Sequence, residues 1–215
     1  SHKFFYSDLI RNICMNSERQ QNFLLRKEKI LAMAEKLLLD NNQDITLEEL
    51  ASELDIAKGT IYKHFDSKNQ LYLELIILNE KRLLDISHKF NTDINSYVSE
   101  YMLYNMLNSN RTILLHVIEE RLTNNERKLN NLFDELYKIR EARILSIKEI
   151  TDKYLKENNS AMSIRDYQSY VWTVTYGACL LLNSTHYQKS IGSRERLIKL
   201  YVNQALMTPD KISAV

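Results

Sequence analysis

The chain has 215 residues, of which 44% are hydrophobic and 27% are charged, and it contains only three glycines and one proline. This length can bury a large core, and because so few residues break helices, the composition predicts an all-α protein. The formal net charge is +1, which excludes a chain-wide attraction to nucleic acid or anionic membranes, so DNA binding would need a local cluster of charges.

The two cysteines, Cys14 and Cys179, fit no metal-ligand or Cys-x-x-Cys spacing. Free thiols in a reducing cytosol are the simplest interpretation, and a disulfide stays open. No segment reaches the roughly 18 apolar residues of a membrane span, and the N-terminus lacks the apolar run of a signal peptide. We therefore expect a cytoplasmic protein with no membrane partner.

The N-terminal part of the chain predicts a three-helix domain spanning residues 20–68. Apolar side chains recur at helical spacing over residues 22–39, which predicts a first helix. Residues 46–49 have the form of a capping box, in which a hydroxyl and a carboxylate bind free amides of the first turn, so a second, short helix begins there. A third helix starts at Lys58, after a tight turn. The extension before this domain, residues 1–19, could be a short helix or a partly ordered arm.

The third helix, which includes the run TIYKHF at residues 60–65, carries an unusual mixture of side chains. Ile61 and Phe65 are four residues apart and can pack inward, whereas the other faces carry hydroxyls and cations. Two short helices joined by a tight turn form a helix-turn-helix, whose second helix can enter a major groove. Lysines would neutralise phosphates there, and hydroxyls would donate to phosphates or base edges. The alternative is a solvated helix face with chance lysines.

The sequence TLEELASELDIAKGTIYKHFDSKNQL, residues 46–71, resembles the N-terminal DNA-binding signature of the TetR family of transcriptional repressors. The resemblance extends over residues 26–72. It implies a homodimer that binds double-stranded DNA at a near-palindromic operator, with this helix of each subunit in a major groove. Gly59 would let the helix approach the DNA closely. The DNA-binding residues that it implies are Thr46, Lys58, Gly59, Thr60, Tyr62, Lys63, His64 and Lys68.

Two residues depart from the family pattern. Asp55 stands where the family usually has glycine, and Ala57 stands where it usually has serine. Aspartate tolerates a left-handed turn, so we expect the fold to persist. Alanine has no side-chain oxygen to cap a helix, and the loss of such a cap typically costs about 1 kcal/mol. The third helix is therefore expected to be less firmly held than in the family.

Residues 69–210 are predicted to form a larger helical domain for ligand binding and dimerisation. A second capping box at residues 67–70 starts a helix that runs towards Phe90. Breaks that contain asparagine or glycine separate the later elements. The helices predicted after Phe90 cover residues 94–107, 111–122, 125–157, 164–187 and 193–206.

The last two helices, residues 164–206, are the predicted homodimer interface. Between residues 167 and 182, apolar side chains occur on all sides of the helix, and a helix of that kind must be covered all round. One domain of this size covers one side, and a partner subunit is the natural cover for the other, as in the four-helix interface that the resemblance implies. A fully buried core helix of a monomer is the alternative.

Methionine and aromatic residues are frequent between Tyr97 and Tyr176. Such side chains suit a pocket for a largely apolar small molecule, although the same pattern is typical of ordinary core. The family resemblance favours the pocket. The predicted ligand-binding residues are Tyr101, Met102, His116, Phe133, Tyr137, Trp172 and Tyr176.

No Gly-rich phosphate loop, nucleophile elbow or metal-hydrolase motif is present, so we expect neither an enzyme nor a cofactor. Asp85 with His88 and His116 with Glu119 have a spacing that can supply metal ligands. Such pairs are common by chance, and we expect no metal site. Glu119 and Glu120 are interpreted as a solvated turn.

These patterns predict a transcriptional repressor that an unidentified, largely apolar small-molecule effector releases from a palindromic operator. Effector binding would be transmitted through the fourth helix. The alternative is a DNA-binding protein of this fold that organises the chromosome or controls division without an effector.

Overall fold

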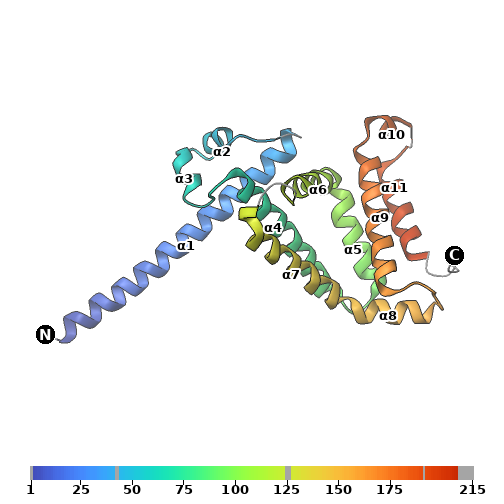
Figure 1. Cartoon of the computed structure of the whole chain (residues 1–215), viewed down its shortest axis with the longest axis horizontal. Helices are drawn as coiled ribbons and strands as arrows, with labels where there is room; N and C mark the ends of the chain where they lie inside the picture. The colour runs from blue at the N-terminus through green and yellow to red at the C-terminus, as the bar shows by residue number, and fades with distance from the viewer. Residues whose placement is uncertain (1, 42–43, 124–126, 191, 208–215) are drawn as a thin grey trace. The chain divides into compact units, whose positions relative to one another are not determined.

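The computed structural model describes residues 2–41, 44–123, 127–190 and 192–207. Over these residues the chain forms eleven α-helices, one 3-10 helix and no strand, which confirms the predicted all-α class (Figure 1). No helix in these ranges is long and apolar enough to cross a membrane. The elements are α1 (His2–Asn41), α2 (Leu47–Glu53), α3 (Lys58–Tyr62), α4 (Lys68–Lys89), α5 (Ile94–Leu107), α6 (Ser109–Thr123), η1 (Arg127–Leu129), α7 (Asn130–Ser146), α8 (Lys148–Glu157), α9 (Ile164–Asn183), α10 (Thr185–Ser190) and α11 (Arg194–Met207).

The first compact unit, residues 1–71, holds α1 to α3 and the first turn of α4. α2 packs against α1, and α3 packs against α2, because each places apolar side chains on one face. Leu50 of α2 and Ile61 of α3 are fully buried. The other buried apolar residues of this unit are Ile30, Leu31, Ala34, Leu38, Ile45, Leu47, Ala51, Phe65 and Leu71.

The first helix is much longer than the predicted residues 22–39, because α1 already begins at His2. No glycine or proline occurs among residues 2–21, so no residue of low helix propensity interrupts the helix there. The N-terminal extension therefore continues α1 and is not a separate short helix. The side chains of residues 2–16, including Cys14, lie outside the described part of the structure.

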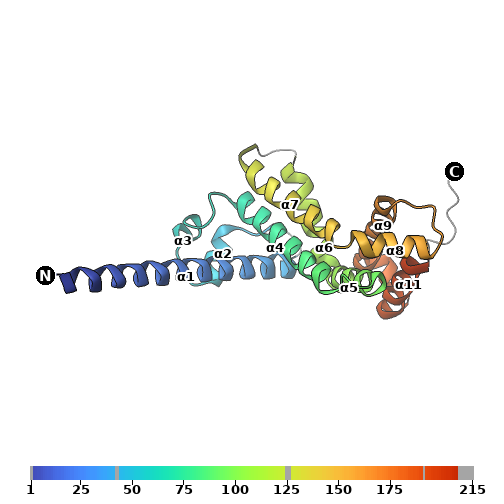
Figure 2. The same ribbon diagram turned by 90° about the horizontal axis from the view of Figure 1, so that it is seen from below.

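The second unit, residues 72–215, is built around α9. This helix packs against α5, α6, α8, α10 and α11. Met102 and Met106 of α5 and Cys179 of α9 are fully buried where these helices meet, and the Cys179 thiol is free. Figures 1 and 2 also show α4 and α7 running side by side. The unit thus holds a helical core with a second helix pair beside it.

Two predicted helices are shorter in the structure. The helix predicted over residues 125–157 is divided into η1, α7 and α8, and residues 124–126 lie outside the described part. The break between α7 and α8 falls at Ile147, next to Ser146, whose hydroxyl lies 2.8 Å from the Arg143 carbonyl oxygen and so competes with the helical hydrogen bonds. The helix predicted over residues 164–187 ends at Asn183, because Ser184 takes an extended backbone conformation.

Candidate functional site

The start of α2 is fixed by the predicted capping box. The hydroxyl oxygen of Thr46 accepts the N–H of Glu49 at 3.1 Å, and the Glu49 carboxylate accepts the N–H of Thr46 at 2.8 Å. These hydrogen bonds hold the pKa of Glu49 below its ordinary value. Two amides that the helix itself cannot satisfy are thereby bonded.

The turn between α2 and α3 shows the left-handed residue and the uncapped helix start that the two departures from the family pattern predict. Asp55 has φ of 51°, in the left-handed region that glycine adopts more easily. Ala57 is the N-cap residue of α3 and provides no side-chain hydrogen bond. The N–H of Ile56 donates to the Ala51 carbonyl at 3.0 Å, and that of Thr60 to the Ala57 carbonyl at 2.8 Å. Backbone hydrogen bonds therefore close the turn in place of a side-chain cap.

The outer face of α3 presents cations and hydroxyls, as the sequence predicts. Lys58, Gly59, Tyr62 and Lys63 are exposed and Thr60 is half-buried, whereas Ile61 is fully buried. Tyr62 keeps 47% of its surface exposed, which is high for a large aromatic side chain. This exposed set can contact a phosphate backbone without any rearrangement of the core.

Two of the predicted DNA-binding lysines already have acidic partners in this chain. Lys58 pairs with Glu48 of α2, and this hydrogen bond raises the pKa of Lys58 and lowers that of Glu48. Lys68 lies 3.5 Å from the Asp44 carboxylate and donates to the Ile45 carbonyl at 3.2 Å. Within the described residues Lys63 makes no ion pair. Its charge is therefore the most available of the three.

His64 differs from the prediction that its side chain faces DNA. The residue is buried, and its ring centroid lies 4.1 Å from that of Phe23 on α1. The ring nitrogen Nδ1 is buried without a hydrogen-bond partner. Burial, together with the positive charges of Arg26 and Lys27, lowers the pKa of His64. The imidazole, just after the end of α3, thus packs against α1 and lies away from the exposed face.

Two cavities of the second unit, of about 400 Å³ and about 310 Å³, are neighbours, because Tyr101, Arg143 and Trp172 line both of them. We call the larger one the α5–α9 cavity and the smaller one the polar cavity. The α5–α9 cavity is lined by Ile94, Tyr97, Val98, Tyr101, Arg143, Ile144, Ile147, Thr151, Arg165, Tyr167, Gln168, Ser169, Val171, Trp172 and Thr173. The polar cavity is lined by Ile76, Asn79, Glu80, Leu83, Tyr101, Asn105, Thr112, Leu115, His116, Glu119, Glu120, Arg140, Arg143, Trp172 and Tyr176.

Four of the seven predicted ligand-binding residues line these cavities. Tyr101 and Trp172 line both, and His116 and Tyr176 line the polar cavity. Three of them form an aromatic cluster, because the Tyr176 ring centroid lies 4.5 Å from that of Trp172 and 5.2 Å from that of His116. Burial raises the pKa of Tyr176 to about 12, so its hydroxyl stays neutral.

The other three predicted residues line neither cavity. Met102 is fully buried in the core beneath α5. Phe133 and Tyr137 are one turn apart on α7 and pack against each other, with ring centroids 6.0 Å apart. Helical spacing identified these side chains as apolar or aromatic, but it could not show which of them face the open space.

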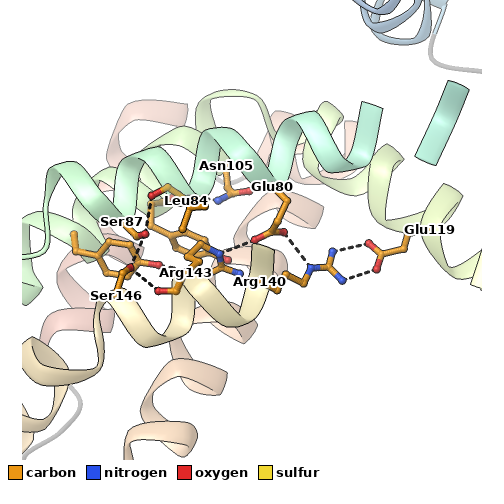
Figure 3. A network of polar contacts seen from close by, with 10 residues as sticks. Glu80, Leu84, Ser87, Asn105, Glu119, Arg140, Arg143 and Ser146 are labelled. Carbon is orange, nitrogen blue, oxygen red and sulfur yellow. Dashed lines mark hydrogen bonds and ion pairs between the residues drawn. The ribbon is translucent and has the colours of Figure 1, made fainter. Parts of the chain in front are cut away.

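The sequence-based interpretation missed a buried network of charges that borders the polar cavity (Figure 3). Glu80 of α4 accepts from Nε of Arg143 at 2.7 Å and from Nε of Arg140 at 3.1 Å. The two terminal nitrogens of Arg140 also donate to the two carboxylate oxygens of Glu119, at 2.6 and 2.8 Å. Burial lowers the pKa of Arg143, but the Glu80 carboxylate outweighs that effect and raises it overall. Opposite charges are thus paired throughout the network, which offsets the cost of burying them.

The interpretation of Glu119 as part of a solvated turn is wrong, because only 9% of its surface is exposed and it lies within α6. A signal was present in the sequence: Arg140 and Arg143 are three residues apart, so they share one face of a helix. Their acidic partners could not be identified, because those lie on other helices.

Comparison with known proteins agrees with this architecture. Residues 30–75 match the model of the family described as bacterial regulatory proteins, tetR family. The HTH-type transcriptional regulator QacR from Staphylococcus aureus is 29% identical over 82 residues. That match covers 38% of this chain and 44% of the relative, so the chain spans less than half the length of this relative.

A solved structure shares the fold over most of the chain. It is a bacterial regulatory protein in the tetR family from Rhodococcus RHA1, with a TM-score of 0.65 and 16% identity over 87% of this chain and 98% of that protein. At this identity the likeness concerns the fold, including the helical second unit. The helix-turn-helix region is therefore similar in sequence to the tetR family of bacterial regulatory proteins, and the fold of most of the chain is similar to that of a regulator of this family.

Proposed function

We propose that this transcriptional regulator is a repressor that binds a palindromic operator as a homodimer and is released by a small ligand bound in its second unit. The observation that carries the proposal is the exposed face of α3, where Gly59, Tyr62 and Lys63 are all accessible to solvent. α2 is capped, and the buried side chain of Ile61 anchors α3 in the core of the first unit. The exposed face of α3 is therefore held in a defined position.

Gly59 supports an approach of α3 to DNA. A Cβ atom at this position would meet no atom of the chain within 4 Å, so packing within the protein does not require a glycine here. A partner that comes close to the helix backbone would require one. The phosphate backbone of a major groove is such a partner, and Lys63 supplies the charge that it attracts.

The homodimer is proposed to form through α9 and α11. Leu180 of α9 and Leu200 of α11 each keep 57% of their surface exposed, although both helices bury their opposite faces in the core. Gly177 lies one turn before Leu180 and is also exposed, which allows another helix to approach closely. Exposed large apolar side chains near one another favour a protein interface, and two copies of one surface can cover each other in a symmetric dimer.

Ligand release is proposed to act through α4. This helix begins at Lys68 in the first unit and continues to Lys89 in the second, where its Glu80 holds both arginines of α7. A ligand beside Arg143 changes this network and with it the position of α4. A coupling free energy of about 1–3 kcal/mol would weaken operator binding roughly 5- to 150-fold.

The test uses the double variant Tyr62→Ala/Lys63→Ala. An operator is first selected from a random pool of DNA duplexes with the wild-type protein, and its affinity is then measured for both proteins at fixed salt. The variant is expected to lose at least about a hundredfold in affinity, since one phosphate or base contact is worth about 1–3 kcal/mol. The double variant Lys153→Ala/Tyr187→Ala, at exposed positions of the second unit, should bind as the wild type does.

Sedimentation should show the same assembly state for all three proteins. Equal operator affinity of the wild type and the Tyr62→Ala/Lys63→Ala variant would reject the assigned DNA-binding face. A wild-type protein that selects no duplex over random competitor DNA would reject the proposed repressor.

A further inference from the structure

We propose that the α5–α9 cavity binds an organic acid, in which a carboxylate is attached to an apolar body, and that Gln168, Arg165 and Arg143 hold the carboxylate. The inference rests on the ligand-binding role proposed above and names the chemical class of the ligand. Three features of the cavity wall carry it: an unsatisfied donor, an excess of positive charge, and an otherwise apolar lining.

The unsatisfied donor is the side-chain amide of Gln168. Its Nε2 nitrogen is buried and has no hydrogen-bond partner, although the residue lines the cavity. A buried donor without a partner lowers the stability of the protein. A ligand that places an acceptor at this point removes that cost and therefore binds more tightly. The amide identifies a place where a bound molecule should present an oxygen.

Three hydroxyls of the same wall already use their protons within their own helices. Thr151, Ser169 and Thr173 each donate to the carbonyl oxygen four residues earlier on their own helix, at 2.7, 2.8 and 2.8 Å. Hydroxyls that are bonded in this way add little polarity to the cavity. The nitrogen donors that the wall offers to a ligand include the amide of Gln168 and the guanidinium groups of Arg143 and Arg165.

The charged residues of the wall are Arg143 and Arg165, and no aspartate or glutamate lines the cavity. Arg143 binds Glu80 through Nε, and one terminal nitrogen lies 3.4 Å from the Tyr97 hydroxyl. Its other terminal nitrogen makes no hydrogen bond within the described residues. In the same part of the structure Arg165 makes no ion pair. Two guanidinium forks with unused N–H groups fit the geometry of a carboxylate.

The rest of the wall is apolar. Aliphatic side chains come from α5, α7, α9 and the α7–α8 junction, and the aromatic rings of Tyr97, Tyr167 and Trp172 lie among them. A cavity of about 400 Å³ is within the size range of small-molecule sites. A cationic ligand would meet only like charges here, and a purely apolar ligand would leave the Gln168 amide unsatisfied. An acid with an apolar body matches every part of the wall.

Binding can be measured through Trp172, because it is the only tryptophan in the chain and it lines the cavity. The probes are hexanoate, decanoate and 3-phenylpropionate, each compared with the alcohol of the same carbon skeleton. Titrations of the full chain are followed by tryptophan fluorescence and repeated by calorimetry. At least one acid is expected to bind about tenfold or more tightly than its alcohol, since charge-assisted hydrogen bonds are the stronger kind.

Two single variants locate the carboxylate. Gln168→Leu and Arg165→Gln should each raise the Kd of the acid about tenfold and leave that of the alcohol nearly unchanged. Arg196→Gln, an exposed α11 residue that lines neither cavity, is the matched control and should bind as the wild type does. An unchanged melting temperature shows that each variant is folded.

Three results would overturn the assignment: no probe acid binds, acids and alcohols bind equally, or the acid binds the two cavity variants as tightly as it binds the wild type. Operator binding of the ligand-free protein is measured on the same preparations. Operator binding without acid binding would refute the proposed ligand class but would still support the proposed repressor function. Acid binding without operator binding would support the cavity assignment and refute the repressor.

Discussion

Glu80 and Arg143 join α4 to α7 in the interior of the second unit, with Nε of Arg143 2.7 Å from the Glu80 carboxylate. Glu80 is only 4% exposed and also accepts from Arg140, so one carboxylate holds two guanidinium groups. A buried charge is tolerated only when its partners compensate for the lost hydration. Glu80 therefore provides the buried charged contacts between α4 and α7.

The Glu80→Ala variant is expected to lower the free energy of unfolding by about 3–5 kcal/mol, because it leaves two guanidinium groups facing each other without their shared acid. Urea denaturation of the full chain measures the change. Lys81→Ala is the control, because the pair of Lys81 with Glu135 on the same two helices is 53% and 46% exposed. Removing that pair should change stability by less than about 1 kcal/mol. Equal losses in both variants would contradict the importance assigned to the buried network.

The Ala57→Ser variant is expected to stabilise the first unit by about 1 kcal/mol, since a serine hydroxyl can accept a free amide of the first turn of α3. The residue already has the extended backbone conformation of a cap. Thermal unfolding measures the gain. Ala142→Ser, on the exposed face in the interior of α7, should instead lower stability by a few tenths of a kcal/mol, roughly the difference in helix propensity. A loss of stability at position 57 would show that α3 does not need the cap.

The Glu48→Gln variant is expected to bind operator DNA several-fold more tightly than the wild type, because Lys58 would lose its intrachain partner and gain phosphate as the alternative. The salt dependence of the affinity should become steeper by about one counterion. Glu53→Gln removes the same charge from an exposed position of α2 that has no ion pair within the described residues. If both variants gain the same affinity for operator DNA, the effect comes from the loss of one negative charge anywhere on α2. The release of Lys58 from Glu48 would then not explain it.

Acidification is expected to destabilise the packing of α3 against α1 through His64. The pKa of His64 lies below its ordinary value of 6.5 in the folded protein, so the unfolded chain binds more protons as the pH falls through that value. Stability is therefore lost below pH 6.5 until the pH reaches the lowered folded pKa. The loss should appear when melting temperatures at about pH 7.5 and about pH 5.5 are compared, and His64→Leu should reduce it.

The matched control for this experiment is His88→Gln, at an exposed position of α4. It should keep the pH dependence of the wild type. A His64→Leu variant with an unaltered pH profile would show that the buried imidazole does not couple protonation to stability.

The Leu180→Glu variant is expected to shift the protein from dimer to monomer, because a buried, unpaired carboxylate at the centre of an apolar interface costs several kcal/mol. Sedimentation velocity over a concentration series measures the shift. Val117→Glu is the control, because Val117 is 58% exposed on α6, outside the proposed interface. A Leu180→Glu protein that remains dimeric would place the interface elsewhere.

The helix-turn-helix could be predicted in detail because its signals are local. The box formed by Thr46 and Glu49, the left-handed turn at Asp55 and the missing cap at Ala57 each depend on residues a few positions apart. Neighbours in sequence are necessarily neighbours in space within a short helix or turn. For the same reason most helices of the second unit were found, although the break at Ile147 and the end of α9 at Asn183 were not predicted.

The sequence by itself determined an all-α chain with a cationic, hydroxyl-bearing helix after a tight turn. Only the tertiary structure decided which ionisable groups are buried. Glu80 and Arg140 are 60 residues apart, and no periodicity pairs them; likewise, the inward position of His64 depends on Phe23 of another helix. Helical spacing specifies which side chains share a face, but burial depends on what distant segments pack over that face, and this is settled only when the whole chain is folded.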